Sequence, residues 1–286
     1  MGRPRSPPGL AKAGQEIVSR PLAVITGASA GIGASFARKL AARGYDLWLV
    51  ARREDRTRLM ARQLSEYHRI HAEPIIADLT QPADLDALAE RIRHAPHLAL
   101  LINNAGFGTN HYYFQTDAAQ QDAMNRLHIV AAGRLTHAAI ANLVPRALPG
   151  TGVINVSSVA AFASAPQNVS YCASKAWMNR FTEGLSIELG AWKSPVTVQS
   201  LCPGYTLSEF HDLTGADRSA IPMGFWCTPD GVVDESLRAF EQRKLFVIPN
   251  WRYKALMGFV RAIPSAWVRW GSVYFVKLYR KNKHGA

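Results

Sequence analysis

A glycine-rich turn between an apolar run and a helical stretch constrains this fold more than any other feature. Residues 22–26 read Leu-Ala-Val-Ile-Thr, which suits a buried parallel strand. The turn at 27–33 follows directly, and a helical stretch then continues to Arg43, before Gly44. Glycine lets the backbone approach an anion, and a helix start favours that anion through its free N–H groups and its dipole. We therefore predict a dinucleotide phosphate site lined by Gly27, Ser29, Ala30, Gly31, Ile32 and Gly33.

Seven apolar runs alternate with helical stretches along the chain. They lie at residues 22–26, 47–51, 73–77, 98–102, 152–156, 196–202 and 245–248. This alternation is typical of repeated strand–helix–strand units in a parallel sheet. With 286 residues, 48% of them hydrophobic, the chain can form one large α/β domain or two small ones. No interdomain linker interrupts the pattern. We predict an α/β fold over residues 21–250, with a single Rossmann-type doubly wound parallel sheet of about seven strands flanked by helices.

Two arginines follow the second predicted strand and indicate which dinucleotide binds. A site for NAD usually ends this strand with a carboxylate for the ribose hydroxyls, whereas arginine accommodates a 2′-phosphate. Here the strand ends with Arg52 and Arg53, while Asp46 lies at its other end and Glu54 points into the next helix. The sequence therefore favours NADP(H) over NAD(H), because both arginines can bind a phosphate in bidentate fashion. The alternative is that the arginines only decorate a helix start.

Tyr171 and Lys175 are four residues apart, and Ser158 lies thirteen positions before the tyrosine. Four residues on a helix place two side chains on one face. A nearby ammonium favours phenolate, and so lowers a phenol pKa from its ordinary value of about 10. Ser158, coming from a neighbouring strand end, can hold a substrate oxygen next to the tyrosine. The trio predicts proton-transfer chemistry, and the alternative is a surface tyrosine beside a solvated lysine.

Several motifs occur in the order and spacing of one known family. They are Thr26-Gly27-x-x-x-Gly31-Ile32-Gly33, Asp78, Asn103-Asn104-Ala105-Gly106, Ser158, Tyr171-x-x-x-Lys175 and Pro203-Gly204. Over residues 20–250 the chain resembles the short-chain dehydrogenase/reductase family. Within that family it looks like the bacterial reductases of the 3-oxoacyl and hydroxysteroid type.

The resemblance implies a role for each matching position. Tyr171 would be the general acid for carbonyl reduction and the base for alcohol oxidation, and Ser158 would orient the carbonyl. Lys175 would bind the nicotinamide ribose and lower the pKa of the tyrosine. The remaining cofactor contacts would come from Asp78 and Leu79 along the adenine, from Asn104, Ala105 and Gly106 in the cleft, and from Pro203, Gly204, Thr206 and Ser208 near the nicotinamide.

His128 departs from the family pattern. It stands where the family has the asparagine that completes a catalytic tetrad and helps a water connect the lysine to solvent. Histidine can donate, accept and titrate near neutrality, so we include His128 among the catalytic candidates as an altered relay. The alternative is a packed histidine with a weakened or lost relay.

The net charge of +12 is concentrated at the two ends of the chain. Residues 1–20 carry +3 and residues 251–286 carry +8, which leaves about +1 for the 230 residues between them. A near-neutral centre argues against a nucleic-acid groove across the fold. The three cysteines have no metal or disulfide spacing, and the pairs His68/His71 and His94/His97 lack an accompanying acid. We therefore expect no metal and a reducing, cytoplasmic compartment.

The two ends and one loop complete the predicted organisation. Residues 1–20 are rich in proline and glycine, so we expect disorder there. Residues 251–286 combine aromatic and basic residues at helical spacing, which predicts amphipathic helices. These helices would contact a membrane surface, or else pack on the domain, cap the substrate pocket or join subunits. The resemblance implies that residues at about 205–230 form a lid over the substrate. The apolar side chains of this lid favour a lipophilic substrate.

Two functions remain open from the sequence. The first is an NADP(H)-dependent carbonyl reductase or alcohol dehydrogenase acting on a fatty-acyl or steroid-like substrate. The second is a cofactor-binding sensor or membrane-associated scaffold on the same fold, with turnover reduced at His128. The resemblance also implies a homodimer or homotetramer built from the helices at 117–143 and 170–190.

Overall fold

A computed structural model describes residues 20–109, 111–209 and 222–262, together with residues 267, 271 and 273. Three sequence predictions fall largely or partly outside these residues. They are the disorder expected at the N-terminus, the central part of the lid, and the C-terminal helix beyond residue 262.

The elements alternate along the chain as the sequence predicts. The strands are β1 (Leu22–Thr26), β2 (Asp46–Ala51), β3 (Ala72–Ile76), β4 (Leu98–Asn103), β5 (Gly152–Val156), β6 (Thr197–Leu201) and β7 (Phe246–Val247). The α-helices are α1 (Gly31–Ala42), α2 (Glu54–His68), α3 (Pro82–Arg93), α4 (Ala118–Asn125), α5 (Ala132–Arg146), α6 (Val169–Ala191), α8 (Pro229–Glu241) and α9 (Trp251–Ala262). Short 3₁₀ turns are η1 (Tyr113–Gln115), η3 (Val159–Phe162) and η5 (Met223–Phe225), and η2 (Arg126–Ala131) is a π-helical turn.

Within the described residues, seven strands form one parallel sheet in the order β3-β2-β1-β4-β5-β6-β7. The predicted doubly wound α/β fold is therefore confirmed. β1 pairs with β2 on one side and with β4 on the other, so the strand order reverses between β1 and β4. In open parallel sheets, ligands bind at the carboxyl ends of the strands beside such a switch point. The topology therefore places a binding crevice where β1 and β4 end.

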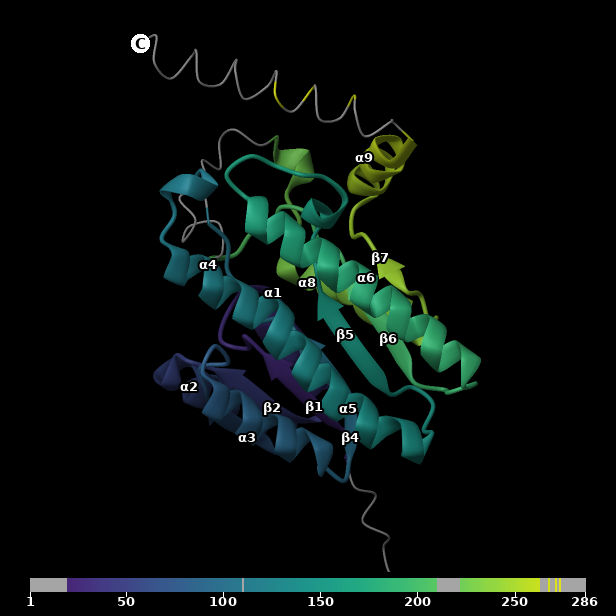
Figure 1. The fold of residues 1–286 in the computed structure, drawn as a ribbon. Coiled ribbons are helices and arrows are strands. Elements are labelled where there is room, and N and C mark those ends of the chain that lie inside the picture. Colours follow the sequence, from purple (N-terminus) through teal and green to yellow (C-terminus); the bar gives the residue numbers. More distant parts are fainter. Residues whose placement is uncertain are drawn as a thin grey trace, which may run out of the picture.

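Helices cover both faces of the sheet. One apolar cluster joins α1, α2 and α8 to the sheet through residues such as Phe36, Leu64 and Phe240. A second cluster joins α3, α5 and α6 to the other face through residues such as Leu88 and Leu135. Figure 1 shows α5 and α6 running across that second face. Because both faces are covered, β1 and β5 are buried along their whole length.

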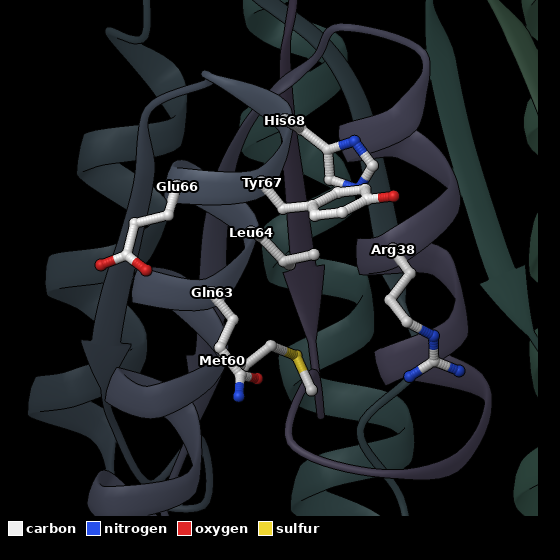
Figure 2. Close-up of a pocket in the computed structure, with 7 residues that line it drawn as sticks. All are labelled: Arg38, Met60, Gln63, Leu64, Glu66, Tyr67 and His68. Carbon is white, nitrogen blue, oxygen red and sulfur yellow. The ribbon is translucent and has the colours of Figure 1, made fainter.

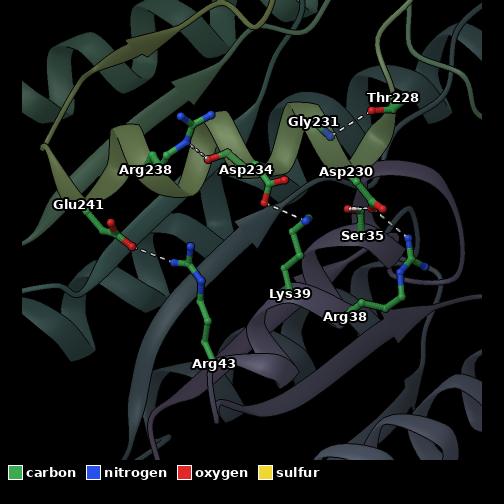
Figure 3. A network of polar contacts seen from close by, with 10 residues as sticks. All are labelled: Ser35, Arg38, Lys39, Arg43, Thr228, Asp230, Gly231, Asp234, Arg238 and Glu241. Atoms are coloured by element: carbon green, nitrogen blue, oxygen red, sulfur yellow. Dashed lines mark hydrogen bonds and ion pairs between the residues drawn. The ribbon is translucent and has the colours of Figure 1, made fainter.

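Polar contacts fasten α8 to α1 along their exposed edges (Figure 3). The hydroxyl of the buried Ser35 donates to Asp230 at 2.5 Å, and Arg38 pairs with the same carboxylate at 3.2 Å. Lys39 pairs with Asp234 at 2.8 Å. Because α1 begins at the glycine turn and α8 follows the lid, these contacts join the two segments that frame the binding crevice.

The first part of the predicted C-terminal extension is the helix α9, which lies near the top of Figure 1. It buries Tyr253 and Met257 against its own domain, and it leaves Trp251 and Phe259 exposed at 68% and 66%. The structure thus shows packing on the domain for one face of this helix. The exposed apolar side chains leave the other predicted uses of the helix open.

One helical run in the described part of the chain, Ala118–Arg146, is long and apolar enough to cross a membrane by length and composition. It consists of α4, η2 and α5. In this fold α5 packs against α3 and the sheet, and it supplies Leu135 and Leu143 to the second core cluster. Core helices of this kind satisfy the same criteria of length and hydropathy.

Candidate active site

The glycine turn between β1 and α1 leaves space for an anion. Gly27 and Gly31 have positive φ angles of 66° and 54°, which side chains rarely adopt. A Cβ on Gly27 would lie 2.8 Å from the amide nitrogen of Asn104, and a Cβ on Gly33 would collide with the Gly27 carbonyl. The helix α1 starts here without a side-chain cap and without an acid in its first turn. The turn therefore offers bare N–H groups and a positive helix end to a phosphate.

The end of β4 is tied directly to this turn. The side-chain amide of Asn104 donates to the carbonyls of Thr26 and Gly27 at 2.9 and 3.1 Å. In return, the Thr26 hydroxyl accepts from the backbone N–H groups of Asn104 and Ala105, both at 3.0 Å. A small crevice at this switch point is lined in part by Thr26, Ala105 and Leu79. Four of the predicted cofactor residues, Gly27, Leu79, Asn104 and Ala105, thus lie together at the predicted edge of the sheet.

The two arginines after β2 point to different places. Arg52 is exposed, and its guanidinium lies 3.9 Å from the carboxylate of Asp78. Arg53 donates from Nε and Nη2 to the Ser29 hydroxyl at 3.2 and 3.1 Å, so it crosses to the glycine turn. The sequence analysis missed Arg56, which lies one turn further along α2 and shares the acid Glu209 with Arg53. The spacing of three residues could have identified Arg56, because residues three apart on a helix lie on the same face and Arg53 was already a candidate.

Ser158 and Lys175 come together where β5 ends and α6 passes. Ser158 caps η3 by accepting from the backbone of Ala160 at 3.1 Å. Lys175 is buried at 4% exposure, and its ammonium donates to the carbonyl of Val156 at 2.8 Å. The same ammonium lies 5.7 Å from the centre of the Tyr171 ring. The predicted trio is thus one cluster, placed beside the switch point by the adjacent strands β4 and β5.

The pKa values in this cluster differ from the sequence prediction. Burial raises the pKa of Tyr171 to about 12, although a hydrogen bond with Ser158 lowers it. Burial also lowers the pKa of Lys175 to about 8. The net pKa of Tyr171 is therefore raised and not lowered, because desolvation of the phenolate is the largest effect on it. The separate effect of Lys175, whose ammonium lies 5.7 Å from the ring centre, stays a prediction. Tyr171 consequently remains protonated at neutral pH.

His128 is completely buried, and both of its ring nitrogens have partners. Nε2 accepts from the backbone N–H of Phe107 at 3.2 Å. Nδ1 lies 2.9 Å from the hydroxyl of Ser174, which itself donates to the carbonyl of Tyr171 at 2.9 Å. Because the serine has one proton and gives it to Tyr171, Nδ1 must be the donor to Ser174. The histidine is therefore neutral, with its proton on Nδ1.

The surroundings of His128 match the interpretation of a packed histidine. Burial, with a smaller effect of Lys175, holds its pKa well below the ordinary value of 6.5. The ring packs against Gly106, whose Cβ would lie 2.7 Å from Nε2, and meets the Tyr171 ring edge-on at 5.8 Å. His128 is therefore a packed histidine that connects the loop after β4 to the catalytic helix α6. Sequence reasoning missed Ser174 as the connecting residue.

The loop after β6 supplies the remaining predicted contacts. The Pro203 carbonyl accepts from the backbone of Val159 at 3.0 Å, which joins this loop to η3. Thr206 donates to the carbonyl of Gly204 at 3.0 Å. Gly204 has no room for a side chain, because the ring of Tyr253 from α9 packs on it. Sequence reasoning missed this contact because nothing in the pattern of α9 indicates where the helix docks.

A separate open hollow lies between α1 and α2 (Figure 2). It is lined by Met60, Leu64, Tyr67 and His68 of α2, with Arg38 of α1 opposite. None of the predicted site residues lines it. Among the described residues, no group of three His, Cys, Asp or Glu side chains is placed to hold a metal ion.

Together, the seven-stranded parallel sheet and the bare glycine turn at its switch point define a Rossmann-type fold, and the adjoining serine, tyrosine and lysine form its candidate acid–base site. The turn fits a dinucleotide, because side chains at Gly27 or Gly33 would fill the cradle. The chain belongs to the short-chain dehydrogenase family of oxidoreductases, whose sequence model, described as "short chain dehydrogenase", matches residues 21–219.

Solved structures and a curated relative resemble the chain. A short-chain dehydrogenase from Sphingobium yanoikuyae in complex with NADPH is 34% identical, with a TM-score of 0.77, over 85% of this chain and 94% of that one. A bulky-bulky ketone specific alcohol dehydrogenase from Comamonas testosteroni is 32% identical, with a TM-score of 0.72, over 86% and 96% of the two chains. The human inactive hydroxysteroid dehydrogenase-like protein 1 is 26% identical over 189 residues, which are 65% of this chain and 56% of that protein.

Proposed function

We propose that this protein is an NADP(H)-dependent oxidoreductase that interconverts a carbonyl and a secondary alcohol on a lipophilic substrate, of 3-oxoacyl or steroid-like type. One observation carries the proposal. A protonated tyrosine, a serine hydroxyl and a buried lysine lie together at the edge of the sheet where the glycine cradle opens. This is the equipment for moving a proton to or from a substrate oxygen.

The residues of the chain have separate tasks in carbonyl reduction. A nicotinamide cofactor, when bound, supplies the hydride. The phenol of Tyr171, which is protonated at neutral pH, donates its proton to the carbonyl oxygen. The Ser158 hydroxyl hydrogen-bonds the same oxygen and fixes its position. The positive charge of Lys175 stabilises the phenolate that remains, because its ammonium lies 5.7 Å from the tyrosine ring.

The contacts around the glycine turn support NADP(H). Arg53 already reaches the Ser29 hydroxyl, and Arg56 lies beside it, so two guanidinium groups and a hydroxyl converge near the turn. Guanidinium groups bind phosphate in bidentate fashion. The neighbour from Sphingobium yanoikuyae, which is in complex with NADPH, supports the same choice. NAD(H) is less favoured, because arginines stand where a carboxylate would contact the ribose hydroxyls.

Exposed apolar side chains in two loops at the carboxyl ends of the strands support a lipophilic substrate. They come from the loops that follow β4 and β6, and they are Tyr113, Phe114, Tyr205, Leu207 and Met223. Apolar lining with few polar groups is typical of sites for small lipophilic ligands. The ketone named for the Comamonas testosteroni relative is also bulky on both sides.

The direct test is oxidation of NADPH in the presence of bulky lipophilic ketones and 3-oxoacyl thioesters. Tyr171→Phe should keep NADPH binding and lose about 10²- to 10⁴-fold in turnover, because only the transferred proton is removed. Equal turnover by the wild type and this variant would contradict the assigned acid.

A second candidate is a cofactor-binding sensor or membrane-associated scaffold with little or no turnover. One observation favours it: both ring nitrogens of His128 are committed to Phe107 and Ser174, so neither remains for a water relay to Lys175. The human relative is also named as inactive. NADPH binding without turnover of any ketone in the panel would support this candidate over the reductase.

Further proposals concern partners and location. The three free cysteines, of which Cys172 and Cys202 are buried, support a reducing, cytoplasmic compartment. The exposed Trp251 and Phe259 on α9 support peripheral contact with a membrane surface. Liposome co-sedimentation that is unchanged by deleting residues 251–286 would contradict that contact. We also propose a homodimer or homotetramer, which light scattering of the full chain would test.

A further inference from the structure

Glu209, the last residue of the lid that the structure describes before residue 222, bridges two arginines beside the glycine turn. Its Oε2 lies 2.7 Å from Nη1 of Arg53, and its Oε1 lies 2.6 Å from Nη1 of Arg56. Each carboxylate oxygen thus has a guanidinium of its own. The two hydrogen bonds hold the pKa of Glu209 below its ordinary value, so the side chain is an anion at neutral pH.

The position of this carboxylate coincides with the place where a cofactor phosphate is expected. Arg53 uses Nε and Nη2 on the Ser29 hydroxyl, and uses Nη1 on Glu209. The same guanidinium therefore connects the glycine turn to the acid. Donors from Arg53 and Arg56 surround one anionic site, and in this structure the carboxylate of Glu209 supplies the negative charge.

The backbone before Glu209 holds the acid in this place. A Cβ on Gly31 would lie 3.1 Å from Cβ of Ser208, so residue 208 lies directly against the glycine turn. Ser208 also donates to the carbonyl of Thr206 at 3.3 Å. Thr206 in turn pairs with Cys227 in an isolated bridge. Glu209 is thus presented by a segment anchored at several points, although its own side chain is exposed at 45%.

We propose that Glu209 is a specificity-determining residue that competes with the 2′-phosphate of the cofactor for Arg53 and Arg56. The inference rests on the proposed use of NADP(H). A phosphate close to an ionised carboxylate is repelled, and both guanidinium groups already have a partner that the phosphate must displace. Glu209 therefore weakens the binding of ligands that carry a 2′-phosphate, and it leaves ligands without that phosphate less affected. Glu209 thus reduces the difference in affinity between NADP(H) and NAD(H) that Arg53 and Arg56 create.

The test is calorimetric titration of the full chain with adenosine 2′,5′-bisphosphate and with adenosine 5′-monophosphate as its control. Glu209→Gln keeps the shape of the side chain and removes its charge, and Glu209→Ala serves as a second variant. Each should tighten binding of the bisphosphate about three- to tenfold, the size expected when two exposed ion pairs no longer have to be broken. Neither should tighten binding of the monophosphate by as much.

Glu241→Gln is the matched charge control, because Glu241 of α8 forms a similar exposed ion pair at 2.8 Å with Arg43, the residue that follows α1. It should leave both affinities unchanged. Unchanged or weaker binding of the bisphosphate in the Glu209 variants would overturn the inference, and so would equal tightening in Glu241→Gln. A wild-type protein that does not bind the bisphosphate at all would instead contradict the proposed cofactor, and the inference with it.

Discussion

His128 provides the sharpest test of how this site is built. Replacing it with asparagine removes a buried neutral ring that accepts from Phe107 and donates to Ser174. At pH 7.5 the change should reduce the free energy of unfolding by about 1–3 kcal/mol, because a buried N–H group loses its partner and a cavity remains. The cost should depend on pH in a way that no exposed histidine reproduces.

The sign follows from proton linkage. Burial holds the pKa of His128 well below 6.5 in the folded protein, whereas in the unfolded chain it returns to about 6.5. Below pH 6.5 the unfolded chain therefore binds a proton that the folded protein does not bind. Each pH unit below 6.5 removes up to about 1.4 kcal/mol of stability until the folded-state pKa is reached. His128→Asn lacks this term, so the gap between the variant and the wild type should narrow as the pH falls.

Urea unfolding at pH 7.5, 6.5 and 5.5 measures this gap. His71→Asn is the control, because it makes the same substitution at an exposed residue. A difference between wild type and His128→Asn that stays constant over the three pH values would show that the ring is not held neutral by burial. It would thereby refute the hydrogen-bond assignment.

Three further changes test other parts of the structure. Asp230→Asn should lower the free energy of unfolding by less than about 1 kcal/mol at pH 7, as is usual for exposed ion pairs. Because the hydrogen bond from Ser35 lowers the pKa of Asp230, this stabilisation is present above pH 3.8 and is lost as the pH falls through the lowered pKa. Urea unfolding across that pH range measures the loss. Gly204→Ala should destabilise the fold by about 1–3 kcal/mol, because the new methyl group displaces Tyr253. In thermal unfolding, the double variant Gly204→Ala/Tyr253→Ala should lose less stability than the sum of the losses in the two single variants. Lys175→Met should abolish turnover and yet raise the free energy of unfolding by up to about 3 kcal/mol at pH 7. The reason is that burial lowers the pKa of this lysine from 10.5 to about 8, so that burying its charge costs stability. A variant that is less stable than the wild type would contradict this cost.

Much of the fold could be read from local pattern. The run at residues 22–26 and the glycines after it specify a strand, a turn and a helix through burial and backbone freedom, which are properties of a few neighbouring residues. The same holds for β5, predicted at 152–156 and observed there. The handedness of strand–helix–strand crossovers reduces the number of possible strand orders, but the order itself comes from the tertiary structure.

Other features depend on residues that are distant in sequence. Arg53 donates hydrogen bonds to Ser29 and to Glu209, and Glu209 lies more than 150 residues later in the chain. These contacts form only when β2, the glycine turn and the lid fold together. The pKa of Tyr171 is also a tertiary property. Sequence spacing places Lys175 on the same helix face, but the degree of burial decides which effect on the phenol is larger.

The sequence by itself determined the parallel sheet, the place of the cradle and the identity of the candidate acid, because periodicity, glycine freedom and helical spacing are local. Only the tertiary structure decided that His128 is a neutral packed ring, and that Tyr253 covers Gly204. Protonation and close packing depend on which groups surround a side chain from every direction. That environment is assembled from strands and helices far apart in the chain.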